Sequence, residues 1–310
     1  MAVLVHYRPD RAARWVEALR TALPDEEIRT WPEAGEPVSV EAVVTMDPEP
    51  GVLDRFPNLR FIASTGAGVE KLLDPDAGPP PGVPICRLVD PELTRGMAEY
   101  VLTAVLRYHR QFEQYEAFSR ERHWNPLPWP SPADRPVGFL GLGVLGTAAA
   151  ALLVRHGFPV LGWSRSPKQV ADIRCEHGAD GLARLLREAR ILVCLLPLTP
   201  ETRGIVNRDL LSRLPPGAHF VNAARGAHVV DADLLAALDS GQLAHATLDV
   251  FHDEPLPTDH PFWAHPRITV TPHIASLTVP ESAARRIADN LRRARAGEPL
   301  LDLADRQRGY

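Results

Sequence analysis

Cysteine is scarce in this sequence, and long apolar runs are missing. The three cysteines, Cys86, Cys175 and Cys194, are an odd and irregularly spaced set among 310 residues. Such a set forms neither a disulfide framework nor a zinc pattern, so we expect a reduced, cytoplasmic protein. The longest apolar stretches, such as residues 191–198, fall short of the roughly 20 residues that a membrane helix needs. Residues 1–15 become charged too early for a secretory signal, so we expect no membrane partner.

An excess of basic residues is also missing. The formal net charge is −5 with neutral histidines, whereas proteins that bind nucleic acid usually carry a basic patch. Arginines do cluster between residues 285 and 295, but they share a helical pattern with apolar Ile287, Ala288 and Leu291. That arrangement is typical of the solvated face of a helix, so we expect no nucleic-acid partner. The length of 310 residues indicates about two domains.

Short apolar runs alternate with helical patterns along most of the chain. Before residue 95, the runs at 2–7, 41–46, 60–65 and 84–89 are typical of buried strands, and residues 11–23 have helical spacing. The alternation resumes later, with strand-like runs at 136–142, 159–163, 191–197, 219–224, 246–251 and 267–272. Strands that alternate with helices predict a parallel sheet covered on both faces. The sequence thus predicts an α/β fold with two doubly wound parallel-sheet domains.

The same pattern predicts the domain boundaries. The last predicted helix, residues 280–296, would carry the chain back to the first unit. We therefore expect one domain from residues 1–95 and 280–310, and the other from residues 96–279. Residues 92–123 have one apolar stripe at three- and four-residue steps, which predicts a single long helix. A helix of this length commonly bridges domains or lies in a subunit interface, so we expect a homodimer.

A glycine-rich turn stands between the first strand and the first helix of the second unit. Gly141 permits a tight turn, Gly143 lets the backbone approach a pyrophosphate, and Gly146 lets the helix pack on the strand. The phosphates would lie at the N-terminus of that helix, beside Val144 and Leu145, where N–H groups favour anions. Glycines also make ordinary turns, but the flanking strand and helix favour a dinucleotide site.

The end of the next strand indicates which dinucleotide is bound. NAD sites usually place Asp or Glu here to accept hydrogen bonds from the ribose hydroxyls. This sequence has Ser164, Arg165 and Ser166 instead. A hydroxyl and a guanidinium suit a 2′-phosphate, so we predict NADP(H) as the preferred cofactor and NAD(H) as the weaker one. The alternative is that Arg165 is an ordinary surface cation.

Three charged residues each stand where a predicted strand of the second unit breaks into a loop. Arg225, Glu254 and His273 follow the runs 219–224, 246–251 and 267–272. In a parallel sheet such strand ends face the ligand crevice. Arg225 could hold a carboxylate by paired hydrogen bonds, His273 could move a proton, and Glu254 could fix the tautomer of His273. Taken singly, each is more often a surface charge or a satisfied polar group; the ordered set predicts hydride transfer to a 2-oxo acid.

A metal site is the other reading of the histidine-rich last quarter of the chain. The histidines concerned are His245, His252, His260, His265 and His273. Their spacings match no compact ligand motif, so no metal is expected.

These motifs together resemble the D-isomer-specific 2-hydroxyacid dehydrogenase family. That family has a Gly-rich loop, an Arg-Gly, a Glu-Pro and a Pro-His in this order, as at residues 141–146, 225–226, 254–255 and 272–273 here. The resemblance covers almost the whole chain. It is greatest to the NADPH-dependent glyoxylate/hydroxypyruvate reductase A group, on the stretches 123–128, 163–166, 195–202, 228–241 and 308–310. It implies a Rossmann cofactor domain, a flavodoxin-like substrate domain and a cleft between them.

The resemblance also implies a role for each matching residue. Arg225 would bind the substrate, His273 would donate and accept the proton, and Glu254 would pair with His273. Residues 65–69 match a loop whose backbone N–H groups, at Gly66, Ala67 and Gly68, hold the substrate carboxylate. The other matches lie beside the cofactor, the last of them at the nicotinamide carboxamide: Leu196, Pro197, Thr202, Ala223 and Asp249.

One position departs from this group. Met46 stands where a tryptophan would be expected near the substrate, and a smaller, flexible thioether predicts a wider pocket. The predicted reaction is therefore the reversible reduction of glyoxylate, hydroxypyruvate or a bulkier 2-oxo acid to the D-2-hydroxy acid.

Three other functions are alternatives for this fold. Formate dehydrogenases of the superfamily have a glutamine at the position of Glu254, and nothing in the sequence supports phosphite oxidation. A non-catalytic NAD(P)-sensing regulator is the alternative from another class, because the fold alone does not exclude it. The intact set of Arg225, Glu254 and His273 argues against a sensor, which needs no proton donor beside a nicotinamide.

Overall fold

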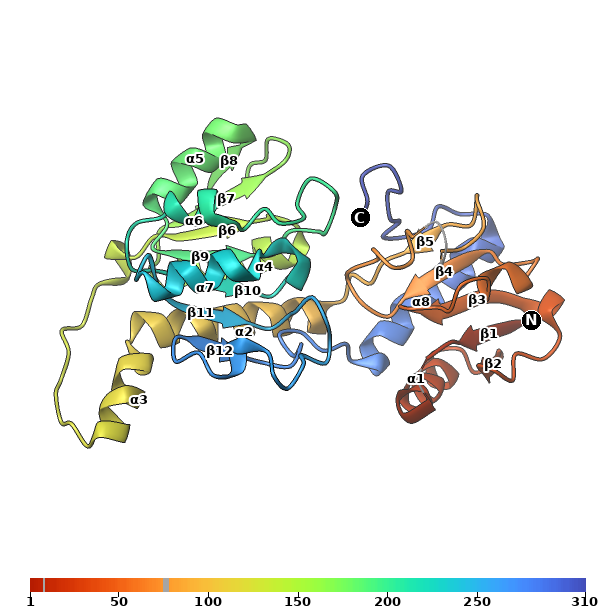
Figure 1. The fold of residues 1–310 in the computed structure, drawn as a ribbon. Helices are drawn as coiled ribbons and strands as arrows, with labels where there is room; N and C mark the ends of the chain where they lie inside the picture. Colours follow the sequence, from red (N-terminus) through yellow and green to blue (C-terminus); the bar gives the residue numbers. More distant parts are fainter. Residues whose placement is uncertain (8, 75–77) are drawn as a thin grey trace. The chain divides into compact units, whose positions relative to one another are not determined.

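The computed structural model describes residues 1–7, 9–74 and 78–310, which form two compact units (Figure 1). Unit 1 consists of residues 1–93 and 277–310, and unit 2 of residues 94–276. The predicted boundaries at 95/96 and 279/280 lie a few residues from these divisions. Each unit is built around its own parallel sheet, so the predicted α/β fold with two parallel-sheet domains is confirmed.

The sheet of unit 1 has five strands in the order β2-β1-β3-β4-β5, and all of its pairings are parallel. The elements of this unit are β1 (Ala2–Val5), α1 (Pro9–Ala22), β2 (Glu27–Thr30), η1 (Pro37–Ser39), β3 (Val40–Thr45), η2 (Leu53–Arg55), β4 (Phe61–Ser64), β5 (Ile85–Cys86) and α8 (Pro280–Ala296). Val3 and Val5 of β1 pack with α1 and α8 on one face, whereas Leu4 between them packs on the other. Alternate side chains of buried strands thus build two cores.

The sheet of unit 2 has seven strands in the order β12-β11-β10-β9-β6-β7-β8, again with parallel pairings throughout. Its strands are β6 (Val137–Leu140), β7 (Val160–Ser164), β8 (Arg174–His177), β9 (Ile191–Cys194), β10 (Ala218–Asn222), β11 (Leu243–Leu248) and β12 (Ile268–Val270). Helices α5 (Gly178–Glu188), α6 (Arg208–Ser212) and α7 (Asp231–Asp239) cover one face. Helices α2 (Pro91–His109) and α4 (Val144–Arg155) cover the other, and short turns η3 (Pro132–Asp134), η4 (Gly226–His228) and η5 (Pro261–Trp263) connect elements.

The prediction of one long helix over residues 92–123 is wrong. The chain forms α2 and a separate helix, α3 (Phe112–Glu121), because Gln111 between them adopts a left-handed conformation with φ 58°. The Gln111 side chain donates a hydrogen bond to the carbonyl oxygen of Pro128 at 2.8 Å, which ties this break to the loop after α3. In Figure 1, α3 and that loop extend away from the sheet of unit 2.

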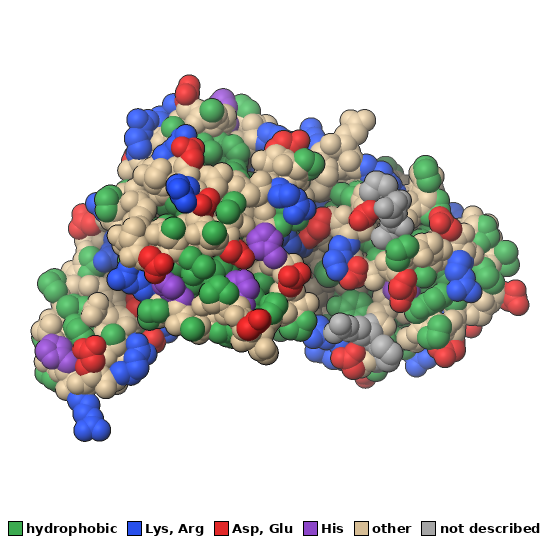
Figure 2. Space-filling model, viewed as in Figure 1, with side chains coloured by type: hydrophobic (Ala, Val, Ile, Leu, Met, Phe, Trp, Pro, Cys, Tyr) green, Lys and Arg blue, Asp and Glu red, His purple; other side chains and the backbone are tan. Residues whose placement is uncertain are grey.

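The surface in view is mixed in charge. Figure 2 shows acidic and basic side chains interspersed over this face of each unit, with apolar side chains between them. Among the residues described, no helix is long and apolar enough to cross a membrane.

Candidate active site

The predicted trio follows three neighbouring strands of unit 2. Arg225 comes after β10, Glu254 after β11 and His273 after β12, and these strands lie side by side in the order β12-β11-β10. Because the strands are parallel, the loops at their carboxyl ends emerge on the same edge of the sheet, where ligands bind in open α/β folds. The topology therefore brings the three loops together.

Glu254 and His273 form a hydrogen-bonded pair. Glu254 Oε2 lies 2.7 Å from His273 Nδ1, and the other oxygen, Oε1, accepts a hydrogen bond from the backbone N–H of Phe251 at 3.0 Å. An ionised carboxylate can only accept, so Nδ1 carries a proton in this pair. The acceptor also stabilises a positive charge on the imidazole. The His273 side chain is 48% exposed, so it is accessible to solvent.

The charge on Glu254 is maintained by its surroundings. Burial is the largest single influence on the carboxyl and acts to raise its pKa. The hydrogen bonds from His273 and Phe251, with the nearby charges of His273 and Arg225, outweigh burial and leave the pKa below its ordinary value. Glu254 thus remains a carboxylate at neutral pH.

Asp249 holds the loop that carries His273. Its carboxylate is fully buried and accepts hydrogen bonds from the Thr271 hydroxyl at 2.6 Å and from the N–H groups of Ile274 and Ala275 at 2.8 Å. Its carbonyl oxygen accepts from the N–H of His273, which adopts a left-handed conformation with φ 54°. These bonds stabilise a backbone conformation that non-glycine residues rarely adopt.

The same network reaches helix α2. Tyr100 lies 2.7 Å from the Thr271 hydroxyl, and because that hydroxyl donates to Asp249, it accepts from Tyr100. Burial raises the pKa of the Asp249 carboxyl, although the hydrogen bonds from Thr271, Ile274 and Ala275 act against this. A role for Asp249 at the nicotinamide carboxamide stays a prediction.

The Arg225 loop is packed closely against the Glu254 loop. Asn222 is fully buried and donates to the Arg225 carbonyl oxygen at 3.0 Å, while its own side-chain oxygen accepts from the N–H of Ala224. A Cβ atom at Gly226 would lie 2.0 Å from the carbonyl carbon of Phe251. Only glycine, which has no Cβ atom, permits this close approach of the two main chains, and this is why a glycine follows Arg225.

The glycine-rich turn has the geometry expected of a dinucleotide loop. Gly141 follows β6 with φ 105°, and Gly143 precedes the first residue of α4, Val144. A Cβ atom at Gly146 would lie 2.1 Å from the carbonyl oxygen of Gly141, so helix and turn touch. No other atom of the described residues lies within 4 Å of a Cβ atom placed at Gly143, which leaves open space beside the N-terminus of α4. Such a terminus favours phosphate groups.

The segment after β9 borders this turn. Leu195 donates its N–H to the Leu140 carbonyl oxygen at 2.8 Å, and the Thr202 hydroxyl donates to the Pro197 carbonyl oxygen at 2.7 Å. Ala223, after the neighbouring β10, is buried and donates its N–H to the Cys194 carbonyl oxygen at 3.4 Å. The predicted cofactor residues Leu196, Pro197, Thr202 and Ala223 therefore lie on the carboxyl edge of the sheet.

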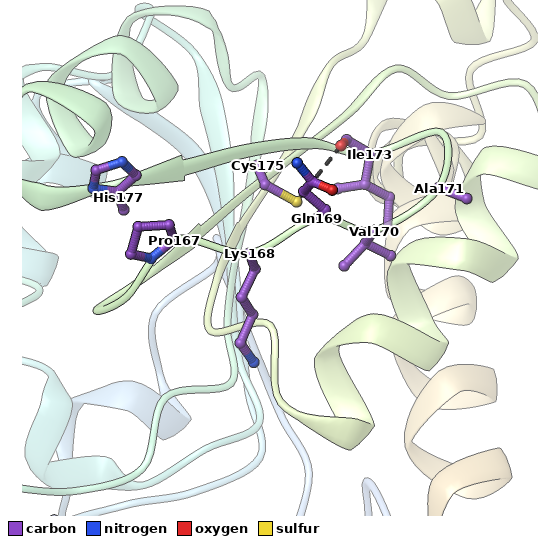
Figure 3. Close-up of a pocket in the computed structure, with 8 residues that line it drawn as sticks. All are labelled: Pro167, Lys168, Gln169, Val170, Ala171, Ile173, Cys175 and His177. Carbon is purple, nitrogen blue, oxygen red and sulfur yellow. Dashed lines mark hydrogen bonds between the residues drawn. The ribbon is translucent and has the colours of Figure 1, made fainter.

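A cavity of about 1010 Å³ adjoins the end of β7. It is lined by residues that follow the Ser164–Ser166 turn and by β8: Pro167, Lys168, Gln169, Val170, Ala171, Ile173, Cys175 and His177 (Figure 3). Within the turn, Ser164 is buried and its hydroxyl donates to the Ser166 carbonyl oxygen at 2.8 Å, while Arg165 is exposed. Lys168, which the sequence reasoning missed, donates to the carbonyl oxygen of Leu142 in the glycine-rich turn at 2.6 Å.

The loop of residues 65–69 lies at the carboxyl edge of the sheet in unit 1. The Ser64 hydroxyl accepts the N–H of Gly66 at 3.2 Å, and Thr278 donates to the Thr65 carbonyl oxygen at 2.7 Å. Within the described residues, the N–H groups of Ala67 and Gly68 donate to no protein acceptor. The Cε atom of Met46 lies 2.2 Å from the position of a Cβ atom at Gly66, so the thioether packs on this loop.

Of the five histidines in the last quarter of the chain, only His252 and His260 share a neighbouring carboxylate among the described residues. His245 contacts Thr269, His252 and His260 lie near Asp231, and His265 lies near Asp239. Within residues 1–7, 9–74 and 78–310, no group of three or more His, Cys, Asp or Glu side chains could hold a metal ion.

Comparison with known proteins identifies the family. Residues 102–275 match the model of the D-isomer specific 2-hydroxyacid dehydrogenase, NAD binding domain. A glyoxylate/hydroxypyruvate reductase A from Serratia proteamaculans is 42% identical over 99% of both chains. A D-isomer specific 2-hydroxyacid dehydrogenase from Xanthobacter autotrophicus, solved in complex with NADPH and MES, has a TM-score of 0.95 and is 44% identical over 99% of both chains.

A second solved structure belongs to the subgroup predicted from the sequence. An NADPH-dependent glyoxylate/hydroxypyruvate reductase from Sinorhizobium meliloti, in complex with NADP and sulfate, has a TM-score of 0.93 and 37% identity over 100% of this chain and 99% of that one. The family expected from the Gly-rich loop and the three charged residues is thus confirmed. The chain belongs to the D-isomer specific 2-hydroxyacid dehydrogenase family, in the glyoxylate/hydroxypyruvate reductase A group.

Proposed function

We propose that this protein reduces a 2-oxo acid to the D-2-hydroxy acid with NADPH. The observation that carries the proposal is the hydrogen bond of 2.7 Å between His273 and Glu254, on the sheet edge that also carries the Arg225 loop and the glycine-rich turn. Family membership confirms the predicted class of NADP-linked oxidoreductase. No observation favours the regulator, because a sensor has no use for a proton donor held in this way.

Each residue of the trio has one task in this reaction. When bound, the nicotinamide supplies the hydride that the carbonyl carbon of the substrate accepts. His273 gives a proton to the carbonyl oxygen, and Arg225 holds the substrate by paired hydrogen bonds. Glu254 stabilises the protonated imidazole and keeps its ring oriented. One hydride and one proton are consumed, and the carbonyl becomes a hydroxyl group.

The substrate carboxylate is assigned to the loop of residues 65–69. Gly66, Ala67 and Gly68 are proposed to present backbone N–H groups to it, as in anion-binding turns. The unused N–H groups of Ala67 and Gly68 support this role, whereas the N–H of Gly66 is already directed at Ser64.

The cofactor is assigned to the carboxyl edge of the sheet in unit 2. The residues proposed to contact it are Gly141, Gly143, Val144, Leu145, Gly146, Ser164, Arg165, Ser166, Leu196, Pro197, Thr202, Ala223 and Asp249. Ser164, Arg165 and Ser166 are proposed to recognise the 2′-phosphate, which makes NADPH the preferred cofactor and NADH the weaker one. The complexes of two relatives with NADPH and with NADP support this assignment.

The substrate is a small 2-oxo acid. The names of the relatives support glyoxylate and hydroxypyruvate. Met46 packs on the proposed carboxylate loop and has a flexible side chain, so bulkier 2-oxo acids are proposed as well.

The enzyme is proposed to be a cytoplasmic homodimer. Trp124 and Trp129, in the loop that extends beyond α3, are 98% and 74% exposed in the single chain. Large exposed aromatic side chains of this kind are typical of interfaces. Three free cysteines agree with a reduced compartment. Light scattering of the purified protein tests the dimer, and a monomeric mass would contradict it.

A substrate panel tests the proposed activity. NADPH and NADH oxidation are measured with glyoxylate, hydroxypyruvate, pyruvate, phenylpyruvate and longer 2-oxo acids, and the product is resolved by handedness. We expect a D product and a higher kcat/KM with NADPH. An L product, or cofactor binding with no turnover of any 2-oxo acid, would refute the proposal.

A further inference from the structure

His228 is a buried histidine directly beside the proposed substrate-binding arginine. It is the last residue of the short turn η4, and its side chain is completely inaccessible to solvent. The backbone N–H of Arg225 donates to its Nδ1 atom at 3.3 Å. Its Nε2 atom lies 3.3 Å from the carbonyl oxygen of Pro197. One imidazole ring therefore joins the Arg225 loop to the segment after β9.

A single tautomer satisfies both contacts. The Arg225 N–H is a donor, so Nδ1 must present its lone pair, and Nε2 then carries the hydrogen and donates to Pro197. The Arg225 carbonyl oxygen, 3.1 Å from Nδ1, already accepts from the Asn222 side chain and from the N–H of His228. It needs no third donor, and the neutral ring with Nε2–H leaves neither ring nitrogen without a partner.

We infer that His228 is a positioning residue for the reaction. It fixes the main chain of Arg225 relative to Pro197, and so holds the substrate-binding guanidinium at a set distance from the cofactor segment. This inference rests on the proposed role of Arg225 in binding the substrate. The position of Pro197 is itself stabilised, because its carbonyl oxygen also accepts a hydrogen bond from the Thr202 hydroxyl at 2.7 Å. Paired hydrogen bonds from a guanidinium require close alignment, so a small rotation of the Arg225 peptide weakens substrate binding.

The two nitrogens have separable effects. Nδ1 acts on Arg225 and therefore on the substrate, whereas Nε2 acts on Pro197 and the cofactor side. Asparagine can replace the first contact, because its side-chain oxygen lies where Nδ1 is. Glutamine can replace the second, because its amide nitrogen reaches the position of Nε2. Leucine replaces neither: the Arg225 N–H loses its acceptor, and the Pro197 carbonyl oxygen keeps only the hydrogen bond from Thr202.

The test compares His228→Leu, His228→Asn and His228→Gln in the full-length enzyme, with kcat, both KM values and Tm measured for each. In His228→Leu, we expect the KM for the 2-oxo acid to rise about tenfold or more, as for a buried N–H that loses its acceptor. His228→Asn should restore this KM to within about threefold of the wild type, whereas His228→Gln should not. His245→Leu, which also removes a buried imidazole of unit 2, should lower Tm and leave the KM unchanged.

A merely structural role predicts another pattern. The KM for the 2-oxo acid would then stay at the wild-type value in all three variants, or would change equally in His228→Asn and His228→Gln. Either result would overturn the inference. If His228→Leu does not fold, the difference in KM between His228→Asn and His228→Gln still tests the inference.

A double-mutant cycle with Arg225→Lys separates this inference from the proposed function. Lysine cannot make the paired hydrogen bonds, so Arg225→Lys alone should raise the KM for the 2-oxo acid. In that background His228→Leu should add no more than about a twofold change, because interacting residues are not additive. Full additivity overturns the role of His228. An unchanged KM in Arg225→Lys would refute the substrate-binding role of Arg225 and the inference that depends on it. If the wild-type enzyme turns over no 2-oxo acid, the proposed function itself is refuted.

Discussion

The carboxyl edges of the two sheets are built in different ways. In unit 2 the edge is held by buried polar side chains. Asn222 and Asp249 each make two or more hydrogen bonds to the loops that carry the trio, and His228 joins the Arg225 loop to Pro197. In unit 1 the loop of residues 65–69 is held by Ser64 and Thr278, and the thioether of Met46 covers it. Its rim carries an ion pair between Lys71 and Asp47 and a hydrogen bond between His6 and Glu49.

Under the proposed function, this difference separates the proton-transfer groups of unit 2 from the recognition of the substrate side chain in unit 1. Buried, satisfied networks specify one arrangement and are costly to disturb, which suits groups that must move a proton in a fixed geometry. A flexible thioether over a main-chain loop can change its shape at little cost. Changes in unit 2 should therefore slow the reaction with every 2-oxo acid, whereas changes at Met46 should alter which acid is preferred.

Replacing Gly226 with alanine should have the largest effect among the changes that test this division. The new Cβ atom would lie 2.0 Å from the Phe251 carbonyl carbon, so the Arg225 and Glu254 loops must separate. A displacement on the order of 1 Å at a catalytic group costs about a hundredfold in kcat/KM. Steady-state kinetics should show this loss with every 2-oxo acid.

Gly96→Ala is the matched control for that change. Its Cβ atom would lie 3.3 Å from the Ser276 hydroxyl, a contact that a small shift relieves. Its kcat/KM should stay within about twofold of the wild type, as for a mild packing change. If the kcat/KM of Gly226→Ala matches that of the control, or falls only with large substrates, the close packing of the Arg225 and Glu254 loops is not required for the reaction.

Glu254→Gln should slow reduction with every 2-oxo acid. The carboxylate accepts the Nδ1 proton of His273 and fixes the orientation of the ring, and a neutral amide is a weaker acceptor. The kcat/KM near neutral pH should fall about thirtyfold, as for the misplacement of a general acid. The pKa of Glu254 lies below its ordinary value, so Glu254 itself should produce no acid limb near neutrality.

The control for Glu254→Gln is Glu188→Gln on α5, which removes an exposed carboxylate paired with Arg174. Its kcat/KM should match that of the wild type. A Glu254→Gln enzyme that also kept the wild-type kcat/KM would show that Glu254 has no part in the reaction.

Arg165→Ala should change the choice of cofactor. Loss of a charged hydrogen bond to the 2′-phosphate should raise the KM for NADPH about tenfold and leave the KM for NADH nearly unchanged. The control is Arg187→Ala, an exposed arginine of α5 whose Nε donates to the Ala183 carbonyl oxygen. An equal change for both cofactors would identify Arg165 as a surface cation.

Met46→Trp should have the smallest effect and the most selective one. An indole over Gly66 narrows the space beside the loop, so kcat/KM for phenylpyruvate should fall about fivefold relative to glyoxylate. The KM for NADPH should not change. Met46→Leu conserves volume and should keep the wild-type ranking. An equal loss with all substrates in Met46→Trp would place Met46 outside substrate recognition.

The sequence predicts the site best at positions where only one kind of residue can meet the physical requirement. The glycine-rich sequence of Gly141, Gly143 and Gly146 predicts a turn whose backbone can approach phosphates. The three charged residues, Arg225, Glu254 and His273, each follow a predicted strand, and a parallel sheet brings the ends of its strands to one edge. Strands β2 and β8 were not predicted, because their side chains are largely exposed or only partly buried and lack an apolar run. The break at Gln111 was missed because the apolar stripe continues through it.

The supporting residues of the site could not be read from the sequence. His228 and Tyr100 act through partners that the fold brings close: Pro197 lies 31 residues from His228, and Thr271 lies 171 residues from Tyr100. Lys168 contacts Leu142 only because β6 and β7 are neighbours. Tertiary contacts of this kind have no local pattern, so composition and periodicity do not reveal them.

His273→Gln tests the proposed reaction most directly, because it removes the proposed proton donor and retains the approximate size of the side chain. NADPH oxidation with the preferred 2-oxo acid and NADPH binding by fluorescence titration are measured on the same preparation. We expect kcat/KM to fall about a thousandfold, as for the loss of a general acid, while the Kd for NADPH stays within about twofold. Turnover at the wild-type rate would contradict the assignment of His273 as the acid.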